Sequence, residues 1–280
     1  MNQTQLPILN VSAYRFAELE DLETKMDLFH RKGVELALKG SILVTPEGVN
    51  VMLASEAEKI WEMHRFMGEV DPKLKDIDFK QSWSQSVPFR RYLVKVKKEI
   101  IKLDLPEIQP LQRQGDHITP EQLKTWYDEG RDFTILDTRN DYEVRVGTFE
   151  NAVDMHLKNF VEFPEKLKEL PAESKKKPLV MFCTGGVRCE RASLVAKDQG
   201  YDEVYQLEGG ILRYFEKVGG AHYKGDCFVF DYRVALTPEL QESQAVLCFV
   251  CGEPLTVEEQ KSEHYQPLVS CPYCIGSTTK

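Results

Sequence analysis

The sequence places a cysteine where a predicted buried strand meets a predicted helix. Cys183 follows the apolar residues 179–182 and comes shortly before a helical stretch at residues 190–198. A side chain at the carboxyl end of a strand in a parallel sheet lies where open α/β proteins bind their ligands. It also faces the N-terminus of the helix, where free N–H groups and the helix dipole stabilise an anion. This position therefore favours a negatively charged sulfur.

The loop after Cys183 contains residues that strengthen this effect. Gly185 and Gly186 allow several backbone N–H groups to point at one centre, and Arg188 adds positive charge. We predict that Cys183 is a nucleophilic thiolate at neutral pH, with Arg188 as its catalytic partner. The competing interpretation is a buried structural cysteine, which is the usual fate of an isolated one. The predicted anion- or substrate-binding loop consists of Thr184, Gly185, Gly186 and Val187.

Four further cysteines form two pairs with the spacing of a metal site. Two residues separate Cys248 from Cys251, and two separate Cys271 from Cys274. Two such pairs predict tetrahedral coordination of a zinc ion by four thiolates. Four thiolates leave no open position, so the predicted zinc is structural rather than catalytic. Four free thiols, or two disulfides formed on oxidation, are the alternatives.

A basic stretch at residues 80–102 is a candidate surface for nucleic acid. Its cations lie along a predicted extended segment, where alternation puts many of them on one face. Trp83, Phe89 and Tyr92 lie among them, and aromatic rings can stack on unpaired bases. A solvated strand edge protected by lysines is the alternative. The side chains that we expect to contact RNA are Arg90, Arg91, Lys95 and Lys97.

Length and composition describe a globular chain with more than one domain. The chain has 280 residues, of which 42% are hydrophobic, and a formal net charge of -9. The negative charge argues against unspecific binding of nucleic acid by the whole surface, although it is compatible with a local basic patch. No run approaches the ~20 apolar residues of a membrane span, and residues 1–9 lack the basic and apolar regions of a signal peptide. We therefore expect a cytoplasmic protein that does not bind membranes.

The order of the predicted elements indicates a mixed α/β protein of three parts. Residues 1–105 have the order strand, helix, strand, strand, helix, strand, which is typical of a ferredoxin-like (acylphosphatase-like) α+β domain. Residues 113–220 alternate short apolar strands with helices, which predicts a mostly parallel sheet covered on both faces. Thr119 and Pro120 indicate the start of the first helix of this part. Residues 221–280 form a small cysteine-rich segment that contains the predicted zinc site.

The central part resembles a rhodanese domain over residues 113–219. The stretch at 136–153 resembles that family's Asp-x-Arg, Glu, Gly and Ala pattern, and the Gly-Gly turn at 207–211 resembles its closing turn. The resemblance implies a cysteine that carries a persulfide or does related thiolate chemistry. Related phosphatases place one more residue between cysteine and arginine, so the shorter loop here suits sulfur or another small group and disfavours phosphatase activity. The residues that match the pattern are Asp137, Arg139, Glu143, Gly147 and Ala152.

Over nearly its full length the chain is similar to the bacterial rhodanese-domain tRNA uridine hydroxylases. The similarity is carried by the segments GSILVTPEGVN, FCTGGVRCE and GDCFVFDYRVA and by the cysteine-rich tail. The family's hairpin turn matches Glu47, Gly48 and Asn50, and its essential cysteine matches Cys183. The resemblance implies oxygen-dependent conversion of the wobble uridine in the tRNA anticodon loop to 5-hydroxyuridine.

The residues themselves leave three functions open. An RNA-modifying enzyme would use Cys183 on an unstacked uridine, a sulfurtransferase would carry a persulfide on Cys183, and a binding module would only recognise an anion. The combination of Cys183 with Arg188 argues against a binding module. The basic segment and the additional domains favour the first function, because a plain sulfurtransferase needs neither. Cys189 either resolves an oxidised Cys183 or packs into the sheet.

Overall fold

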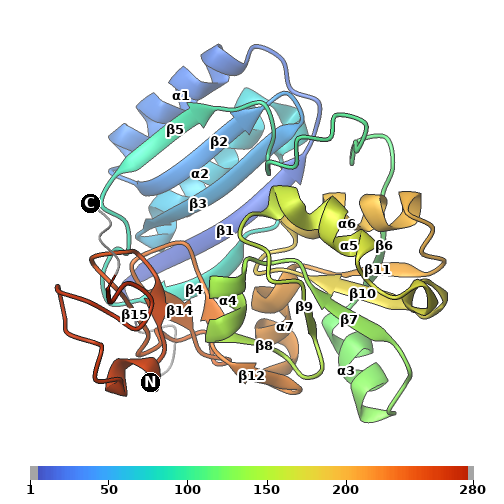
Figure 1. The fold of residues 1–280 in the computed structure, drawn as a ribbon. Helices are drawn as coiled ribbons and strands as arrows, with labels where there is room; N and C mark the ends of the chain where they lie inside the picture. The colour runs from blue at the N-terminus through green and yellow to red at the C-terminus, as the bar shows by residue number, and fades with distance from the viewer. Residues whose placement is uncertain (1–5, 277–280) are drawn as a thin grey trace.

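The structure is a computed structural model that describes residues 6–276. The ends of the first and last predicted parts, residues 1–5 and 277–280, lie outside the described residues. Figure 1 shows an N-terminal sheet with its helices, a second sheet between helices, and a C-terminal segment of short hairpins beside them. This arrangement confirms the predicted fold class. Within the described range, no helix is both long and apolar enough to cross a membrane.

The N-terminal sheet has the strand order β4-β1-β3-β2-β5. Its first four strands pair antiparallel in the ferredoxin-like manner, and β5 adds to the edge parallel to β2. The basic stretch 80–102, predicted to be one extended segment, therefore contains two strands on opposite edges of the sheet. They are separated by a loop with Pro88, which has no N–H to donate to a sheet. The elements of this part are β1 (Ile8–Phe16), α1 (Leu22–Glu35), β2 (Lys39–Thr45), β3 (Gly48–Ser55), α2 (Ala57–Val70), β4 (Lys80–Ser84) and β5 (Tyr92–Val96).

Both helices of this part bury one side against the sheet. Ile60, Met63 and Met67 of α2 are fully buried, at the spacing of one face of a helix. Phe29 of α1 is buried in the same core. Burial of each such side chain stabilises the fold by about 1.5–3 kcal/mol. The core therefore fixes the sheet, including the tight turn between β2 and β3.

The central sheet has the strand order β6-β11-β10-β7-β9, and all neighbouring strands are parallel. Helices α5 and α6 cover one face, and α3 and α7 cover the other (Figure 1). Helix α3 begins at a capping box of Thr119 and Gln122, with Pro120 at its first position as predicted. The elements are β6 (Asp116–Ile118), α3 (Pro120–Asp128), β7 (Thr134–Asp137), α4 (Asp141–Val146), β8 (Gly147–Phe149), β9 (Val153–Asp154), α5 (Phe163–Lys168), β10 (Leu179–Phe182), α6 (Val187–Asp198), β11 (Val204–Leu207) and α7 (Gly210–Val218).

The C-terminal segment consists of two-residue and three-residue strands. Strand β12 pairs with β8 of the central part, and the others form two small hairpins. Side chains and backbone also tie the segment to the N-terminal part: Arg233 Nη1 donates to Ser82 Oγ at 2.7 Å, and the N–H of Tyr232 donates to the carbonyl of Pro88 at 3.0 Å. The strands are β12 (Tyr223–Gly225), β13 (Cys227–Phe228), β14 (Ala235–Leu236), β15 (Val246–Leu247) and β16 (Pro254–Leu255).

The N-terminal part also contacts helix α6 through charged and polar side chains. Glu47, in the turn between β2 and β3, accepts hydrogen bonds at 2.6 and 2.5 Å from the guanidinium of Arg191, which is buried. Tyr14 of β1 donates to Glu190 Oε1 at 2.8 Å. The turn that carries the family resemblance is therefore a contact between two parts of the chain.

We expect Glu47→Gln to lower the free energy of unfolding, because Arg191 would lose its charged partner. Removing the partner of a buried charge costs about 3 kcal/mol. The matched control is Glu35→Gln. The Glu35 carboxylate pairs with Lys32 at the surface, so this variant should change the free energy of unfolding far less. Urea unfolding monitored by tryptophan fluorescence measures both. Equal losses in the two variants would contradict the importance of the Glu47–Arg191 contact.

Candidate active site

Cys183 lies between the end of β10 and the start of α6, as the sequence predicts. Its side chain is buried, with 1% of its surface exposed. The N–H of Gly186 donates to the sulfur of Cys183 at 3.1 Å. Gly186 is the N-cap of α6 and has a φ of 102°, a left-handed conformation that glycine adopts without strain. The sulfur is therefore held at the positive end of the helix.

The start of helix α7 binds the carbonyl groups of the loop. The N–H groups of Ile211 and Leu212 donate to the carbonyls of Cys183 and Thr184 at 3.0 and 3.1 Å. Gly210 has a φ of 66°, and a Cβ atom on it would lie 2.4 Å from the Cys183 carbonyl oxygen. Only glycine fits here, which gives a physical reason for the Gly-Gly turn in the sequence.

The surroundings of Cys183 favour the thiolate. Burial raises the pKa of the Cys183 thiol, but the hydrogen bond from the Cys189 thiol, the charge of Arg188 and the N–H groups of Arg188 and Gly186 outweigh this effect and lower the pKa to about 6. At neutral pH the sulfur is therefore mostly ionised. Such a sulfur can act as a nucleophile or accept a sulfur atom.

Arg188 is not a free cation next to the sulfur. Its guanidinium donates two hydrogen bonds of 2.8 Å to the carboxylate of Glu143, which is fully buried. Burial lowers the pKa of Arg188, but the Glu143 carboxylate outweighs this effect and raises the pKa above its ordinary value. The pair keeps Arg188 charged and fixed in position, so its positive charge still acts on the thiolate while Glu143 balances it.

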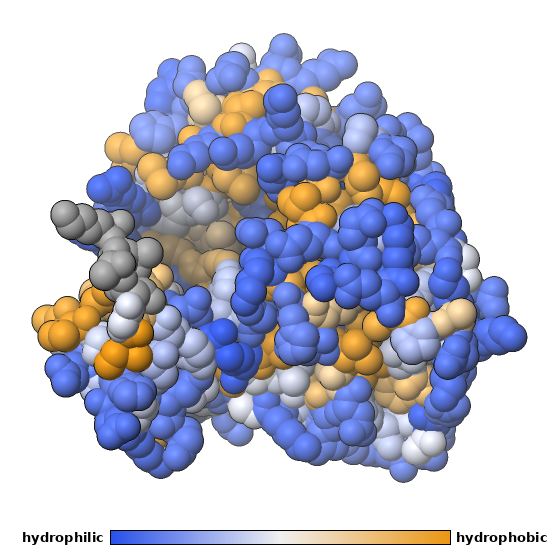
Figure 2. Space-filling model, in the orientation of Figure 1, coloured by the Kyte–Doolittle hydropathy of each residue, from blue (hydrophilic) through white to orange (hydrophobic). Residues whose placement is uncertain are grey.

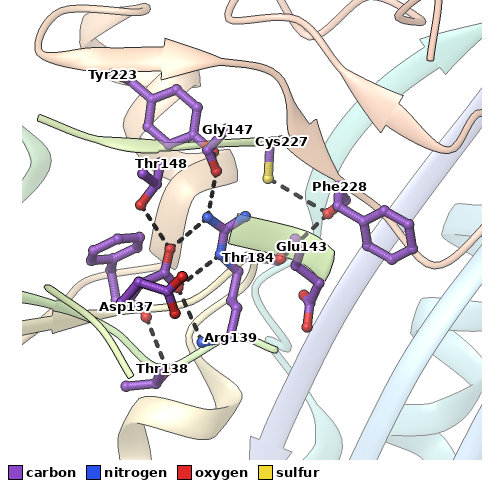
Figure 3. A network of polar contacts seen from close by, with 12 residues as sticks. Asp137, Thr138, Arg139, Glu143, Gly147, Thr148, Thr184, Tyr223, Cys227 and Phe228 are labelled. Carbon is purple, nitrogen blue, oxygen red and sulfur yellow. Dashed lines mark hydrogen bonds and ion pairs between the residues drawn. The ribbon is translucent and has the colours of Figure 1, made fainter. Parts of the chain in front are cut away.

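A second buried ion pair supports the segment that carries Glu143 (Figure 3). Arg139 donates to both carboxylate oxygens of Asp137 at 2.9 and 2.6 Å, and to the carbonyl of Gly147 at 2.6 Å. Thr148 donates to Asp137 Oδ2 at 2.8 Å. The residues of the Asp-x-Arg pattern thus hold both ends of α4. Because α4 carries Glu143, they also keep Glu143 in place. Its role is to support the loop rather than to contact the sulfur.

The N-terminal part covers the loop of Cys183. An ideal Cβ on Gly186 would lie 2.9 Å from the hydroxyl of Tyr14, and one on Gly185 would lie 3.8 Å from Ser12 Oγ. The ammonium group of Lys80 lies 5.1 Å from the centroid of the Tyr14 ring and is almost fully buried. Burial and the Glu190 carboxylate raise the pKa of Tyr14, so its hydroxyl stays protonated. The spacing along the sequence contains no signal for these contacts.

A cavity of about 600 Å³ lies between the N-terminal sheet and the C-terminal segment. Figure 2 shows this face of the molecule hollowed, with apolar residues on the floor of the hollow. Arg90 and Arg91 line the cavity together with Phe89, Phe230 and Tyr232. The ring of Phe230 also lies 5.8 Å from the Arg188 guanidinium, so the cavity reaches towards the loop of Cys183.

Of the four residues predicted to bind RNA, only Arg90 and Arg91 line this cavity. Lys95, in β5, and Lys97, just beyond it, are exposed and lie on the same side of the strand as Leu93, which does line the cavity. Lys80 lies on the opposite edge of the sheet, near the loop of Cys183. The basic stretch therefore divides between two places. Phe230 and Tyr232, both about half exposed, were not predicted.

The four cysteines of the C-terminal segment lie together and could hold a metal ion. Their sulfur atoms all lie within 4.8 Å of one another. Three of the distances are 3.9 Å (Cys248 to Cys274), 3.6 Å (Cys251 to Cys271) and 3.6 Å (Cys271 to Cys274). A tetrahedron with metal–sulfur bonds of about 2.3 Å has edges of about 3.8 Å. These distances fit a four-thiolate site, and they are too long for disulfides, whose sulfur atoms lie about 2.0 Å apart.

Labelling of Cys183 by iodoacetamide should rise with pH to half of its maximum near pH 6, because the thiolate is the reactive form. Burial raises the pKa of Cys227 to about 12, so Cys227 should stay unlabelled at pH 7. Mass spectrometry of the labelled peptides measures both. If Cys183 reacts no faster than Cys227 at pH 7, the interpretation of the loop is wrong.

The variant Gly210→Ala tests whether the loop geometry causes this reactivity. The added methyl group would push the Cys183 carbonyl away, so labelling at pH 7 should slow. Gly130→Ala is the matched control, because Gly130 has a similar φ of 63° but open space around the position of a Cβ. The control should retain the labelling rate of the unmodified protein.

Comparison with protein families identifies two of the three parts. Residues 8–100 match the model of the UPF0176 acylphosphatase-like domain, and residues 119–217 match the rhodanese-like domain. Among solved structures, a rhodanese-like domain protein from Staphylococcus aureus is 26% identical, with a TM-score of 0.30 over 35% of this chain and 90% of that chain.

Similar proteins match over nearly the whole chain. A protein of Cupriavidus necator named tRNA uridine(34) hydroxylase is 47% identical, over 97% of this chain and 98% of its own length. A protein of Burkholderia cenocepacia with the same name is 46% identical, over 96% of this chain and 98% of its own length. These identities extend through both matched domains and the cysteine-rich segment. The chain belongs to the tRNA uridine(34) hydroxylase family.

Proposed function

We propose that this protein converts uridine 34, the wobble uridine of tRNA, to 5-hydroxyuridine, with dioxygen as co-substrate and Cys183 as the reacting group. The observation that carries the proposal is the buried Cys183 thiolate in a chain that matches the hydroxylases over its full length. A sulfurtransferase with a persulfide on Cys183 is the other chemistry that such a loop allows. The hydroxylase relatives span all three parts of the chain, so we favour hydroxylation.

A thiolate can activate the uridine ring for this reaction. C5 of uridine reacts poorly with oxygen until its electron density increases. Addition of the Cys183 thiolate to C6 would move an electron pair to C5 and spread negative charge towards O4. The fixed charge of Arg188 and the N–H groups of the loop are available to stabilise that charge. In this mechanism Cys183 is the covalent nucleophile and Arg188 acts electrostatically.

The cavity between the N-terminal sheet and the C-terminal segment is the proposed site for the anticodon loop. Arg90 and Arg91 would bind phosphates there, and Phe230 and Tyr232 would stack on unpaired bases. Lys95 and Lys97 would extend the phosphate contacts along β5. Bases of an anticodon loop are partly unstacked, so presenting one in a pocket costs only a few kcal/mol. A tRNA substrate also implies a cytoplasmic enzyme.

The buried position of Cys183 requires the loop to open for the base. Strand β1 lies over the loop, and the contact of Tyr14 with Glu190 holds it there. Binding of the anticodon loop to Arg90 and Arg91, which belong to the same N-terminal part, would supply the free energy to separate Tyr14 from Glu190. We therefore propose that tRNA binding and exposure of the sulfur occur together.

We propose that the four-cysteine cluster binds one structural zinc ion. Cys248, Cys271 and Cys274 are buried, and the four sulfur atoms fill the coordination positions of a tetrahedral ion. When bound, the ion would cross-link the C-terminal segment, which has few long elements of its own. The segment lines the proposed anticodon cavity through Leu247 and Gly252, so the metal would stabilise one wall of that cavity.

Elemental analysis of protein purified without chelator should find about one zinc per chain. Cys271→Ser should lower the zinc content and the melting temperature, because it removes a buried ligand. Ser262→Ala, at a partly exposed position of the same segment outside the cluster, is the control and should retain the metal. Metal-free protein with an unchanged melting temperature would contradict a structural role.

An anticodon stem-loop with 5-fluorouridine at position 34 tests the chemistry. Fluorine at C5 cannot leave as the C5 proton does, so addition of Cys183 at C6 should leave a covalent adduct that mass spectrometry detects on Cys183. Cys183→Ser should form no adduct and no 5-hydroxyuridine, while its affinity for tRNA stays nearly unchanged. Absence of an adduct, together with a persulfide on Cys183 in active enzyme, would favour the sulfur route.

The double variant Arg90→Glu and Arg91→Glu separates binding from chemistry in the same assay. It should weaken tRNA binding, with a smaller dependence of affinity on salt, because two phosphate contacts are lost. Alkylation of Cys183 should be unchanged, since neither arginine lies in its loop. If tRNA affinity and its salt dependence stay as in the unmodified protein, the proposed cavity is not the RNA site.

A further inference from the structure

A second thiol lies directly beside Cys183. Cys189, in the first turn of α6, is fully buried in the same core cluster as Cys183, and each thiol shifts the pKa of the other. The backbone of Gly186 contacts both residues: its N–H donates to the Cys183 sulfur at 3.1 Å, and its carbonyl accepts from the N–H of Cys189 at 3.0 Å. The hydroxyl of Thr138 contacts the Cys189 sulfur at 3.6 Å. Both cysteines are therefore fixed against the same glycine at the start of α6.

The proposed reaction needs electrons as well as a nucleophile. Dioxygen places one oxygen atom on the base, and the other leaves as water, which consumes two electrons and two protons. Oxidation of two thiols to a disulfide releases two electrons and two protons. A pair of thiols at the reacting sulfur can therefore balance one turnover.

We propose that Cys189 is a second catalytic residue, and that the Cys183–Cys189 thiol pair supplies the two electrons for hydroxylation and ends each turnover as a disulfide. The inference rests on the proposed hydroxylation of uridine. It also implies a partner for the enzyme: a dithiol reductant must reduce the disulfide to two thiols before the next turnover.

The steps balance in atoms and electrons. Cys183 adds to C6, and the resulting carbanion at C5 bonds to dioxygen and takes up a proton, which gives a C5 hydroperoxide. The Cys189 sulfur attacks the outer oxygen, the O–O bond breaks, and the base keeps a C5 hydroxyl while Cys189 becomes a sulfenic acid. Loss of the C5 proton and departure of Cys183 restore the ring. Cys183 then attacks the Cys189 sulfur, which forms the disulfide and releases water.

The different environments of the two sulfurs suit these different roles. Burial and the adjacent Cys183 raise the pKa of Cys189 well above its ordinary value, so Cys189 stays a thiol while Cys183 is the thiolate. Cys189 therefore does not compete for C6 and retains a proton to give to the hydroperoxide oxygen. Cys227, the other buried cysteine near the loop, donates instead to the carbonyl of Phe228 at 3.7 Å. It is not part of the pair.

The test is a reaction without added reductant. Protein reduced with dithiothreitol and then freed of it is mixed with excess unmodified tRNA in aerated buffer. Product should stop at a single 5-hydroxyuridine per chain, as a two-electron store requires. Peptide mass spectrometry should show a Cys183–Cys189 disulfide that forms only when both tRNA and oxygen are present. Renewed addition of dithiothreitol should restart turnover.

Variants separate Cys189 from the other thiols. Cys189→Ser keeps a hydrogen-bond donor, so it should still form the 5-fluorouridine adduct on Cys183 yet yield no 5-hydroxyuridine in the reductant-free reaction. Cys227→Ser is the matched control and should retain the single turnover. Disulfide mapping in the unmodified protein does not depend on how the variants fold.

The outcomes distinguish this inference from the proposed function. Repeated turnover without reductant, a single turnover by Cys189→Ser, or product without the disulfide would overturn the role of Cys189 while hydroxylation stands. Absence of 5-hydroxyuridine from the unmodified protein, even with dithiothreitol and oxygen, would overturn both.

Discussion

The negative charge on a buried sulfur is the constraint on which the rest of the site depends. With 1% of its surface exposed, Cys183 receives almost no stabilisation from water, so the protein must supply it. The N–H groups at the start of α6 do so, while the loop carbonyls are bound by N–H groups at the start of α7, where Gly210 lies against the Cys183 carbonyl. Two helices from different points of the chain are thus needed to hold one thiolate.

Two buried ion pairs hold the positive charge of Arg188 in position near the thiolate. Glu143 keeps Arg188 in place and balances its charge, and the Asp137–Arg139 pair anchors the short helix that carries Glu143. Buried ion pairs of this kind add little to stability compared with apolar packing, but loss of one partner is costly. Their value here is positional, because they fix the distance between a charged group and the sulfur. The same helix α6 then presents Arg191 to Glu47, which couples the loop to the N-terminal part.

Much of the fold and the centre of the site follow from local sequence patterns. The order of strands and helices in the N-terminal part, the first residues of α3 and the cysteine between β10 and α6 follow from local features, and each lies where it was predicted. Contacts between distant segments were not predictable in this way. No spacing rule connects Tyr14 to residue 186, or Phe230 to Arg188. The basic stretch was interpreted as one extended face, but the loop around Pro88 sends its two halves to opposite edges of the sheet.

The closed arrangement over Cys183 has a chemical consequence. An exposed thiolate with a low pKa is easily oxidised, and a vicinal thiol would then trap it as a disulfide in the absence of substrate. Strand β1 and Tyr14 keep solvent from the sulfur, and they belong to the same N-terminal part that contributes Arg90 and Arg91 to the cavity. A substrate that binds those arginines therefore acts on the part that covers the thiolate. The three parts of the chain thus act together in the proposed reaction: the contacts that stabilise the thiolate, those that cover it and those that would bind the RNA belong to connected parts of one structure.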